Sequence, residues 1–201
     1  MSGGRLETFA DGVFAIAATL LILNVDTQIK PEGRGLAAQL LHIWPSYIGY
    51  AVSFLTIGII WVNHHTLMNQ IGQVDRPFLL LNVLLLLCVA FIPFPTRLVA
   101  ENIRTDGARA AALTYGTTLT ATAVMFSGVW FYAAIGRRLI REDADPRTVS
   151  GITRSYLPGP WIYLAATLIA LANPTVSVIL FGAIAIFYVA ESSLFGRKEP
   201  L

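Results

Sequence analysis

Residues 77–98 read PFLLLNVLLLLCVAFIPFPTRL, and this stretch decides the fold class. No charged residue interrupts it before Arg97, and its length suits a helix that crosses a bilayer, for which about 20 apolar residues are needed. Pro77 fits the first turn of a helix, whereas Pro93 and Pro95 are expected to kink its far end. The stretch therefore predicts a membrane-spanning helix over residues 77–98.

The composition of the whole chain agrees with this prediction. Of the 201 residues, 55% are hydrophobic and 13% are charged, and the mean hydropathy is +0.64. Soluble domains contain about 25% charged residues, so lipid is the solvent that this chain suits. The net charge of +2 gives no indication of nucleic-acid binding. The single cysteine, Cys88, lies inside the apolar run, where a packed or lipid-facing side chain is expected.

Apolar stretches separated by polar segments predict six membrane-spanning helices in a single domain over residues 1–201. Their expected ranges are 6–25, 44–62, 77–98, 110–135, 158–172 and 175–194. A short amphipathic segment, 36–43, leads into the second helix, and the connections 63–76 and 136–154 are polar. We therefore predict an all-α integral membrane protein with six transmembrane helices, forming one six-helix repeat per chain.

Six spans place both ends of the chain on the same side of the membrane. If that side is the cytoplasm, nine of the 14 lysine and arginine residues fall in cytoplasmic segments. Such an excess of positive charge is typical of cytoplasmic loops. We therefore expect both termini in the cytoplasm.

Ionisable residues occur in the first two turns of the first helix, where burial is costly without partners or water. Arg5 and Asp11 lie about 120° apart around a helix axis, so they and Glu7 need partners elsewhere. The end of the second helix lies at the same membrane depth and carries Trp61, Asn63, His64 and His65. We predict a buried polar cluster that joins the two helices. The alternatives are solvated interfacial residues or a purely structural contact.

The adjacent histidines, His64 and His65, bear on two further hypotheses. Neighbouring side chains point about 100° apart on a helix, and no cysteine or carboxylate stands at ligand spacing, so no metal site is predicted. Protonation of either histidine would make the polar cluster sensitive to pH.

The second half of the first helix carries a stripe of aliphatic side chains. Ile16, Leu20 and Leu23 recur at i, i+4 and i+7 and share one face, which Thr19 borders. By itself such a stripe indicates packing or lipid contact. The chain contains no Thr-Val-Gly-Tyr-Gly filter. It also lacks a phosphate-binding loop, a dinucleotide turn and a nucleophile elbow, so we predict that it is not an enzyme. The many threonines of 110–135 favour helix packing.

Two segments of the chain resemble a known family. Residues 5–16, RLETFADGVFAI, are similar to the first-helix signature of the transmembrane protein 175 family, the lysosomal potassium channel of animals and its prokaryotic relatives. The signature reads Arg, three residues, then Phe-Ser-Asp-Gly; Ala10 stands in place of its serine, and the matching residues are Arg5, Phe9, Asp11 and Gly12. The segment 61–65, WVNHH, resembles the Trp-and-His motif of the same family.

The resemblance implies a potassium-permeable, modestly selective cation channel without a cofactor. Prokaryotic family members with one repeat per chain are homotetramers whose first helices line a central pore. This implies a tetramer in a prokaryotic plasma membrane, with K⁺ as the permeant ion. The aliphatic rings that constrict the pore of the family correspond here to Ile16, Leu20 and Leu23, and the pore-side hydroxyl corresponds to Thr19. The signature residues and the histidine region would then hold the first helix in place.

Other functions are compatible with the same residues. A proton-coupled or ion-coupled secondary transporter would use Asp11, His64 and His65 as a proton relay. A non-conducting membrane scaffold would use the polar cluster only to set helix packing. In a channel, Asp26 and Glu32 would concentrate cations at the outer mouth, although loop carboxylates are commonly just solvated.

Overall fold

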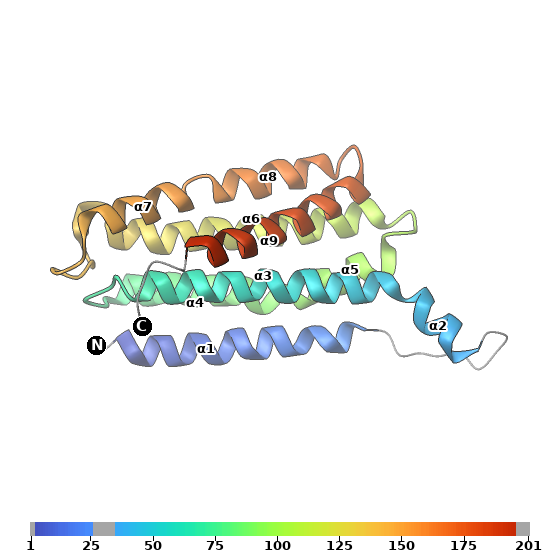
Figure 1. The fold of residues 1–201 in the computed structure, drawn as a ribbon, viewed down its shortest axis with the longest axis horizontal. Coiled ribbons are helices and arrows are strands. Elements are labelled where there is room, and N and C mark those ends of the chain that lie inside the picture. The colour runs from blue at the N-terminus through green and yellow to red at the C-terminus, as the bar shows by residue number, and fades with distance from the viewer. Residues whose placement is uncertain (1–2, 26–34, 196–201) are drawn as a thin grey trace.

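The computed structural model describes residues 3–25 and 35–195, with side chains up to residue 190. Within these ranges the chain is helical, and its one β-type contact is an isolated bridge between Ile71 and Ile140. In chain order (Figure 1), the elements are α1 (Gly3–Leu20), η1 (Leu21–Asn24), α2 (Leu36–His42), α3 (Trp44–Met68), α4 (Arg76–Phe91), α5 (Pro93–Asn102), α6 (Ala108–Ala134), η2 (Ile135–Arg137), α7 (Pro146–Tyr156), α8 (Gly159–Ile169) and α9 (Pro174–Phe195).

The predicted fold class, an all-α membrane protein, is confirmed. Four helical stretches are long and apolar enough to cross a membrane, namely Gly3–Asn24, Trp44–Met68, Arg76–Asn102 and Ala108–Arg137. α9 adds a shorter apolar helix over Pro174–Ala190, and α8 is an apolar helix of 11 residues. The six predicted spans thus correspond to α1, α3, α4 with α5, α6, α8 and α9.

The second span is longer than the range 44–62 that we predicted. α3 continues through residues 63–68, because His64, Leu67 and Met68 lie on its buried side and extend its packed face by one turn. The histidines therefore belong to the helix itself rather than to the polar connection that follows it.

Two other boundaries differ for reasons of backbone chemistry. The helix predicted over 77–98 breaks before Pro93, which has no amide hydrogen to donate, and restarts as α5, which ends at Asn102. The segment 136–154 was predicted as a polar connection, but it contains most of α7. The side chain of Asp145 caps this helix by accepting hydrogen bonds from two backbone amides of its first turn.

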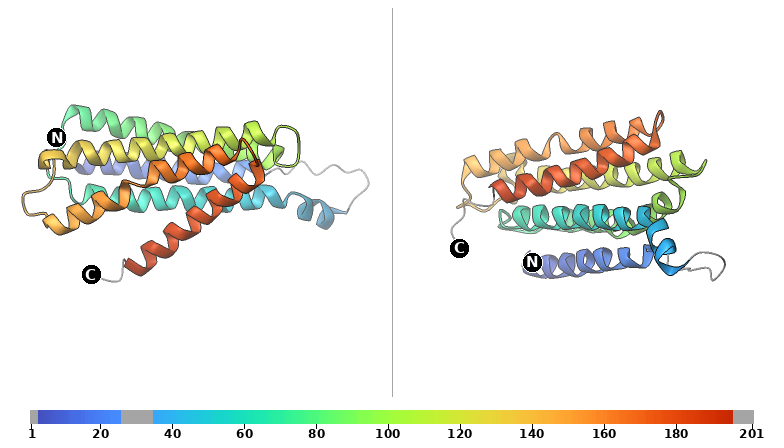
Figure 2. Two further views of the ribbon diagram at one scale, coloured as in Figure 1. Left: turned by 90° about the horizontal axis from the view of Figure 1, so that it is seen from above. Right: turned by 45° about the vertical axis from the view of Figure 1, so that its right-hand side comes forward.

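α1 lies along one edge of the bundle (Figure 1). It packs against α3 and α4, and in the described part of the chain neither Figure 1 nor the right-hand view of Figure 2 shows a helix on its outer side. α6 contacts α4 and α5 as well as α8 and α9, so it connects the two halves of the bundle. This arrangement leaves α1 with one packed face and one uncovered face.

α6, α8 and α9 approach one another closely at Gly116. A Cβ atom at this position would lie 2.5 Å from Oγ1 of Thr167 and 2.8 Å from Cζ of Phe181. The absence of a side chain at Gly116 thus permits the contact. One helical turn away, the hydroxyls of Thr120 and Thr167 are 3.1 Å apart and join α6 to α8. This threonine therefore serves helix packing, as we predicted for the segment 110–135.

A buried group of hydroxyls joins α3, α5 and α6. Oγ of Ser53 lies 2.8 Å from Oγ1 of Thr96 and 3.0 Å from the hydroxyl of Tyr115, and all three side chains are buried. Each hydroxyl has a partner, so burial leaves none of them unsatisfied. The group fixes α3, against which α1 packs.

Asp75 joins the start of α4 to the end of α6. Its carboxylate accepts hydrogen bonds from the amide of Phe78 (2.9 Å) and the hydroxyl of Tyr132 (2.7 Å), and the guanidinium of Arg138 is 3.6 Å away. Loss of solvent around the carboxylate would by itself raise the pKa of Asp75. The two hydrogen bonds and the positive charge of Arg138 outweigh that effect and lower the pKa.

We expect the lowered pKa of Asp75 to appear as acid sensitivity of the fold. A carboxyl whose pKa is lower in the folded state stabilises the protein above its unfolded value of about 3.9, and this stabilisation is lost as the pH falls through the folded value. Asp75→Asn should lower the melting temperature in detergent at neutral pH and make it fall less steeply in acid. Asp106→Asn is the control, because Asp106 is exposed. Equal acid slopes for wild type and Asp75→Asn would contradict this role.

Candidate functional site

The uncovered face of α1 carries the aliphatic stripe. Ile16 is 60% exposed, Leu20 43% and Leu23 72%. The opposite face, which packs on α3 and α4, is formed by the buried side chains of Leu6, Ala10, Phe14, Ala17 and Leu21. From Leu21 to Asn24 the helix is of the 3₁₀ type, in which residues three apart lie in line, so Leu23 stands close to the line of Leu20. The stripe is therefore available to lipid, to another copy of the chain or to a pore.

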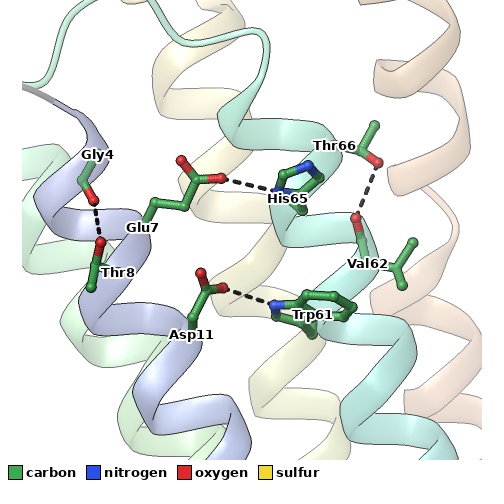
Figure 3. A network of polar contacts seen from close by, with 8 residues as sticks. All are labelled: Gly4, Glu7, Thr8, Asp11, Trp61, Val62, His65 and Thr66. Atoms are coloured by element: carbon green, nitrogen blue, oxygen red, sulfur yellow. Dashed lines mark hydrogen bonds and ion pairs between the residues drawn. The ribbon is translucent and has the colours of Figure 1, made fainter. Parts of the chain in front are cut away.

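Two polar contacts join the first turns of α1 to the end of α3 (Figure 3). Nε1 of Trp61 donates a hydrogen bond of 2.8 Å to Asp11, and Nδ1 of His65 lies 3.0 Å from a carboxylate oxygen of Glu7. We predicted a buried cluster, but the side chains of His65 and Glu7 are 55% and 32% exposed. These contacts therefore lie at the surface of the chain and hold the position of α1 relative to α3.

His64, unlike His65, points into the bundle. It is 1% exposed, and Nε2 lies 2.9 Å from Oδ1 of Asn82 in α4. The amide nitrogen of Asn82 donates in turn to the carbonyl of Phe78 at 2.8 Å, and the ring of Phe14 lies 5.6 Å from that of His64 between ring centroids. His64 thus links α1, α3 and α4 through satisfied buried contacts.

Asn82 is the site residue that the sequence prediction missed. The available signal was its isolation, because it is the one polar side chain in the run from Phe78 to Ile92 apart from the thiol of Cys88. A polar residue in such a run needs a buried partner, and His64 provides it.

The remaining signature residues divide between the two faces of α1. Ala10, in place of the serine, is fully buried against the bundle. Phe9 is 57% exposed, and a Cβ atom added to Gly12 would meet nothing within 4 Å. Arg5 is exposed and makes no ion pair with any residue that the structure describes, so it does not join the cluster within one chain.

Asn63 of α3 contacts α7 instead of α1. Its backbone carbonyl accepts a 3.2 Å hydrogen bond from the hydroxyl of Tyr156.

The end of η1, which continues α1, is fixed by a different contact. The side-chain amide of Asn24 donates a hydrogen bond of 2.6 Å to the carbonyl of Pro93, at the break between α4 and α5. Thr19 lies between this end and Ile16, and its hydroxyl donates to the α1 carbonyls of Ala15 (2.9 Å) and Ile16 (3.0 Å). The oxygen of this exposed hydroxyl keeps lone pairs that can accept from, or coordinate, a partner.

In the described ranges, no three histidine, cysteine or carboxylate side chains gather closely enough to hold a metal ion, since His64 and His65 diverge. Asp26 and Glu32, expected at the outer mouth, lie outside the described residues.

These features define an α-helical integral membrane protein whose first helix is packed on one side only. Residues 5–93 match the family model of the endosomal/lysosomal potassium channel TMEM175. A potassium channel of Chamaesiphon minutus is 40% identical over 192 residues, covering 94% of this chain and 95% of the relative. A potassium channel of Streptomyces collinus is 37% identical, covering 92% of this chain and 90% of the relative. The chain belongs to the TMEM175 family.

The fold agrees with this membership. The crystal structure of a lysosomal potassium-selective channel TMEM175 homolog from Chamaesiphon minutus matches with a TM-score of 0.87 and 38% identity, over 94% of this chain and 97% of that one. The predicted resemblance is thus confirmed. The family is one of ion channels, which also confirms the prediction that the chain is not an enzyme.

Proposed function

We propose that this protein is a potassium channel in which the uncovered face of α1 lines the pore of a homotetramer. The observation that carries the proposal is the exposure of Ile16, Leu20 and Leu23 on a helix whose other face is fully packed. The similar proteins of Chamaesiphon minutus and Streptomyces collinus are both potassium channels, and each aligns with nearly the whole of this chain. A pore at a symmetry axis would give the uncovered face of each α1 a defined environment.

The stripe would then form the constriction. Four Ile16 side chains around an axis present only aliphatic surface to the pore, and a narrow apolar neck closes by losing its water. Leu20 and Leu23 add further rings, because the 3₁₀ turn keeps them near one line. Movement of α1 away from the axis would widen the neck and let water return.

Thr19 is the polar group nearest to this stripe. Its hydroxyl donates back to its own helix, so its oxygen is left to face a cation. Potassium binds its hydration water less tightly than sodium, and an apolar neck with few oxygens therefore favours potassium only modestly. K⁺ is the permeant ion in this proposal, and no cofactor takes part.

The polar contacts would set the pose of the pore-lining helix. Two polar contacts, Asp11 with Trp61 and Glu7 with His65, hold the first turns of α1. The ring of buried His64 lies against that of Phe14 on the packed face of α1. Arg5, Phe9 and Gly12 face outward on the same turns, where a neighbouring subunit would meet them. These residues position α1 and do not bind the ion.

The membrane orientation follows from the charges between the spans. Arg76, Arg137, Arg138, Arg141 and Arg147 all fall in connections or helix ends on the side of the N-terminus. The positive-inside rule then places both termini in the cytoplasm. The membrane is the plasma membrane of a prokaryote, in line with one six-helix repeat per chain.

Potassium flux into liposomes tests the pore. A polar side chain at the constriction should keep water in the neck, and lowering the barrier by about 1.4 kcal/mol speeds passage about tenfold. We expect potassium flux from the wild-type protein and about tenfold faster, less selective flux from Ile16→Asn. Ile179→Asn is the matched control, because Ile179 is 63% exposed but lies on α9; its flux should equal that of the wild type.

Three outcomes would contradict the proposal in different ways. Absence of flux from purified tetramers and from Ile16→Asn would exclude a channel. Potassium movement that requires a proton gradient would indicate a coupled transporter. Flux unchanged by Ile16→Asn would leave a channel but place its constriction elsewhere.

A further inference from the structure

A groove of about 1200 Å³ follows α3 on the side of α7, α8 and α9. In the left-hand view of Figure 2, α9 runs obliquely away from the other helices toward its C-terminal end. It contributes Tyr188 and Val189 to the groove, which residues of α1, α3, α6, α7 and α8 otherwise line. Its lining is mainly apolar and aromatic and includes Phe54, Leu119, Phe126, Tyr163 and Tyr188. Since these helices span the membrane, lipid is the medium around the open side of the groove in a single chain.

α7 forms the polar end of the groove. Val149 is buried against the bundle, whereas Thr148, Gly151 and Ser155 of the same helix line the groove. Arg147 and Arg154 are seven residues apart and so lie about 20° apart around the helix axis, with Gly151 about 40° from the first of them. Neither arginine is in the lining itself, but both lie within about 60° of Gly151 around the axis and about 10 Å from each other along it, which places them at the edge, or rim, of the groove.

The guanidinium groups of the neighbouring arginines all have partners, whereas those of Arg147 and Arg154 do not have one among the described residues. Arg137 donates to the carbonyls of residues 141 and 144, Arg138 lies 3.6 Å from Asp75, and Arg141 is paired with Asp143 at 2.7 Å. Within the residues that the structure describes, no hydrogen bond or ion pair engages the guanidinium of Arg147 or of Arg154.

Two carboxylates, at the start of α7 and in the groove lining, accept hydrogen bonds from other groups. Asp145 accepts hydrogen bonds from the amides of Arg147 and Thr148 and from the Thr148 hydroxyl. Asp11, on the far side of the groove, accepts from Trp61. The rim thus offers two free positive charges, and Ser155 adds an exposed hydroxyl.

We propose that this groove binds one anionic phospholipid, with its phosphate between Arg147 and Arg154 and an acyl chain along α3. A charged rim at the polar end of an apolar groove matches the two halves of such a lipid. Arginine is suited to the phosphate, because its planar guanidinium donates two parallel hydrogen bonds. The groove lining includes α1 residues but none of the stripe residues Ile16, Leu20 and Leu23, so the proposal does not require that the stripe lines a pore.

Native mass spectrometry of the purified full-length protein tests the site. Phosphatidylglycerol and phosphatidylcholine with the same acyl chains are titrated separately, and the affinity of the first bound lipid is measured. Each arginine near an anionic surface contributes about a factor of five, so Arg147→Gln with Arg154→Gln should weaken phosphatidylglycerol binding about 30-fold. The phosphatidylcholine affinity should fall much less, because the choline cation cancels the charge of its phosphate. Arg109→Gln is the control and should behave as the wild type, because Arg109 is exposed and lies at the start of α6, whereas α7 follows the end of α6.

A second variant tests the groove itself. Gly151→Trp should block it, because a Cβ atom at Gly151 meets nothing within 4 Å and the ring can enter the open space. Ser150→Trp, on the same helix but not in the lining, is the control. Wild-type affinity in the double arginine variant would overturn the proposal. Equal competition by glycerophosphoglycerol, which lacks acyl chains, would overturn it in favour of a phosphate site. A changed subunit number in Gly151→Trp would show that another copy covers the groove.

Discussion

Gly116→Leu is expected to destabilise the protein by about 3 kcal/mol or more, at the upper end of the range for overpacking in well-packed interiors. Even the Cβ atom would lie 2.5 Å from Oγ1 of Thr167 and 2.8 Å from Cζ of Phe181. A leucine adds three more carbons to a space that is already closed. The neighbours sit on two different helices, so α8 and α9 would both have to move.

Unfolding in mixed micelles with increasing dodecyl sulfate, followed by circular dichroism, measures this loss. Gly128→Leu is the matched control, because it places the same side chain on the same helix where a Cβ atom meets nothing within 4 Å. Equal unfolding midpoints for the two variants would show that α6, α8 and α9 are not held together at Gly116.

Asn82→Leu is expected to cost about 1–3 kcal/mol, because it leaves a buried hydrogen-bonding group of His64 without its partner. Leucine has the same number and branching of side-chain heavy atoms as asparagine and leaves no cavity, so the loss reports mainly the polar contact. His64→Phe should leave Oδ1 of Asn82 equally unsatisfied while keeping a ring against Phe14. The double variant removes both polar groups, so it should be more stable than the sum of the two single changes predicts.

The same unfolding assay gives all four free energies of this cycle. His65→Phe provides the comparison, because the side chain of His65 is 55% exposed and exposed ion pairs contribute only about 0–1 kcal/mol. Additive losses in the His64 and Asn82 variants would mean that the 2.9 Å contact does not couple α3 to α4.

The spans could be predicted from hydropathy because a bilayer imposes one length on every apolar helix. The predicted helix boundaries were wrong where a single hydrogen bond or a helix cap determines where a helix begins or ends. α3 extends beyond Val62 because His64 has a buried partner that a hydropathy pattern cannot show. α7 is helical although polar, because Asp145 caps its start and its apolar side packs on the bundle.

The sequence could predict which residues form the candidate site, but not in which directions their side chains point. Trp61 and His65 were expected to meet α1, and their contacts with Asp11 and Glu7 are present. The different directions of His64 and His65, about 100° apart, follow from helical geometry, but the sequence does not say which of them points inward. Arg5 was expected to join the cluster and instead points outward from the chain, a position that packing between chains rather than within one would explain.

The bond between Asn24 and the carbonyl of Pro93 has a mechanical consequence. It fixes one end of the first spanning element to the break between α4 and α5, while the other end is held by the exposed contacts of Asp11 and Glu7. At 1.5 Å per residue, about 20 Å separate Asn24 from Asp11, so a tilt of about 5° around the fixed end displaces the other by about 2 Å. Such a tilt would break the exposed contacts of Asp11 and Glu7 and shift the buried side chains of Leu6 and Ala10 on the bundle, while the bond of Asn24 stays in place.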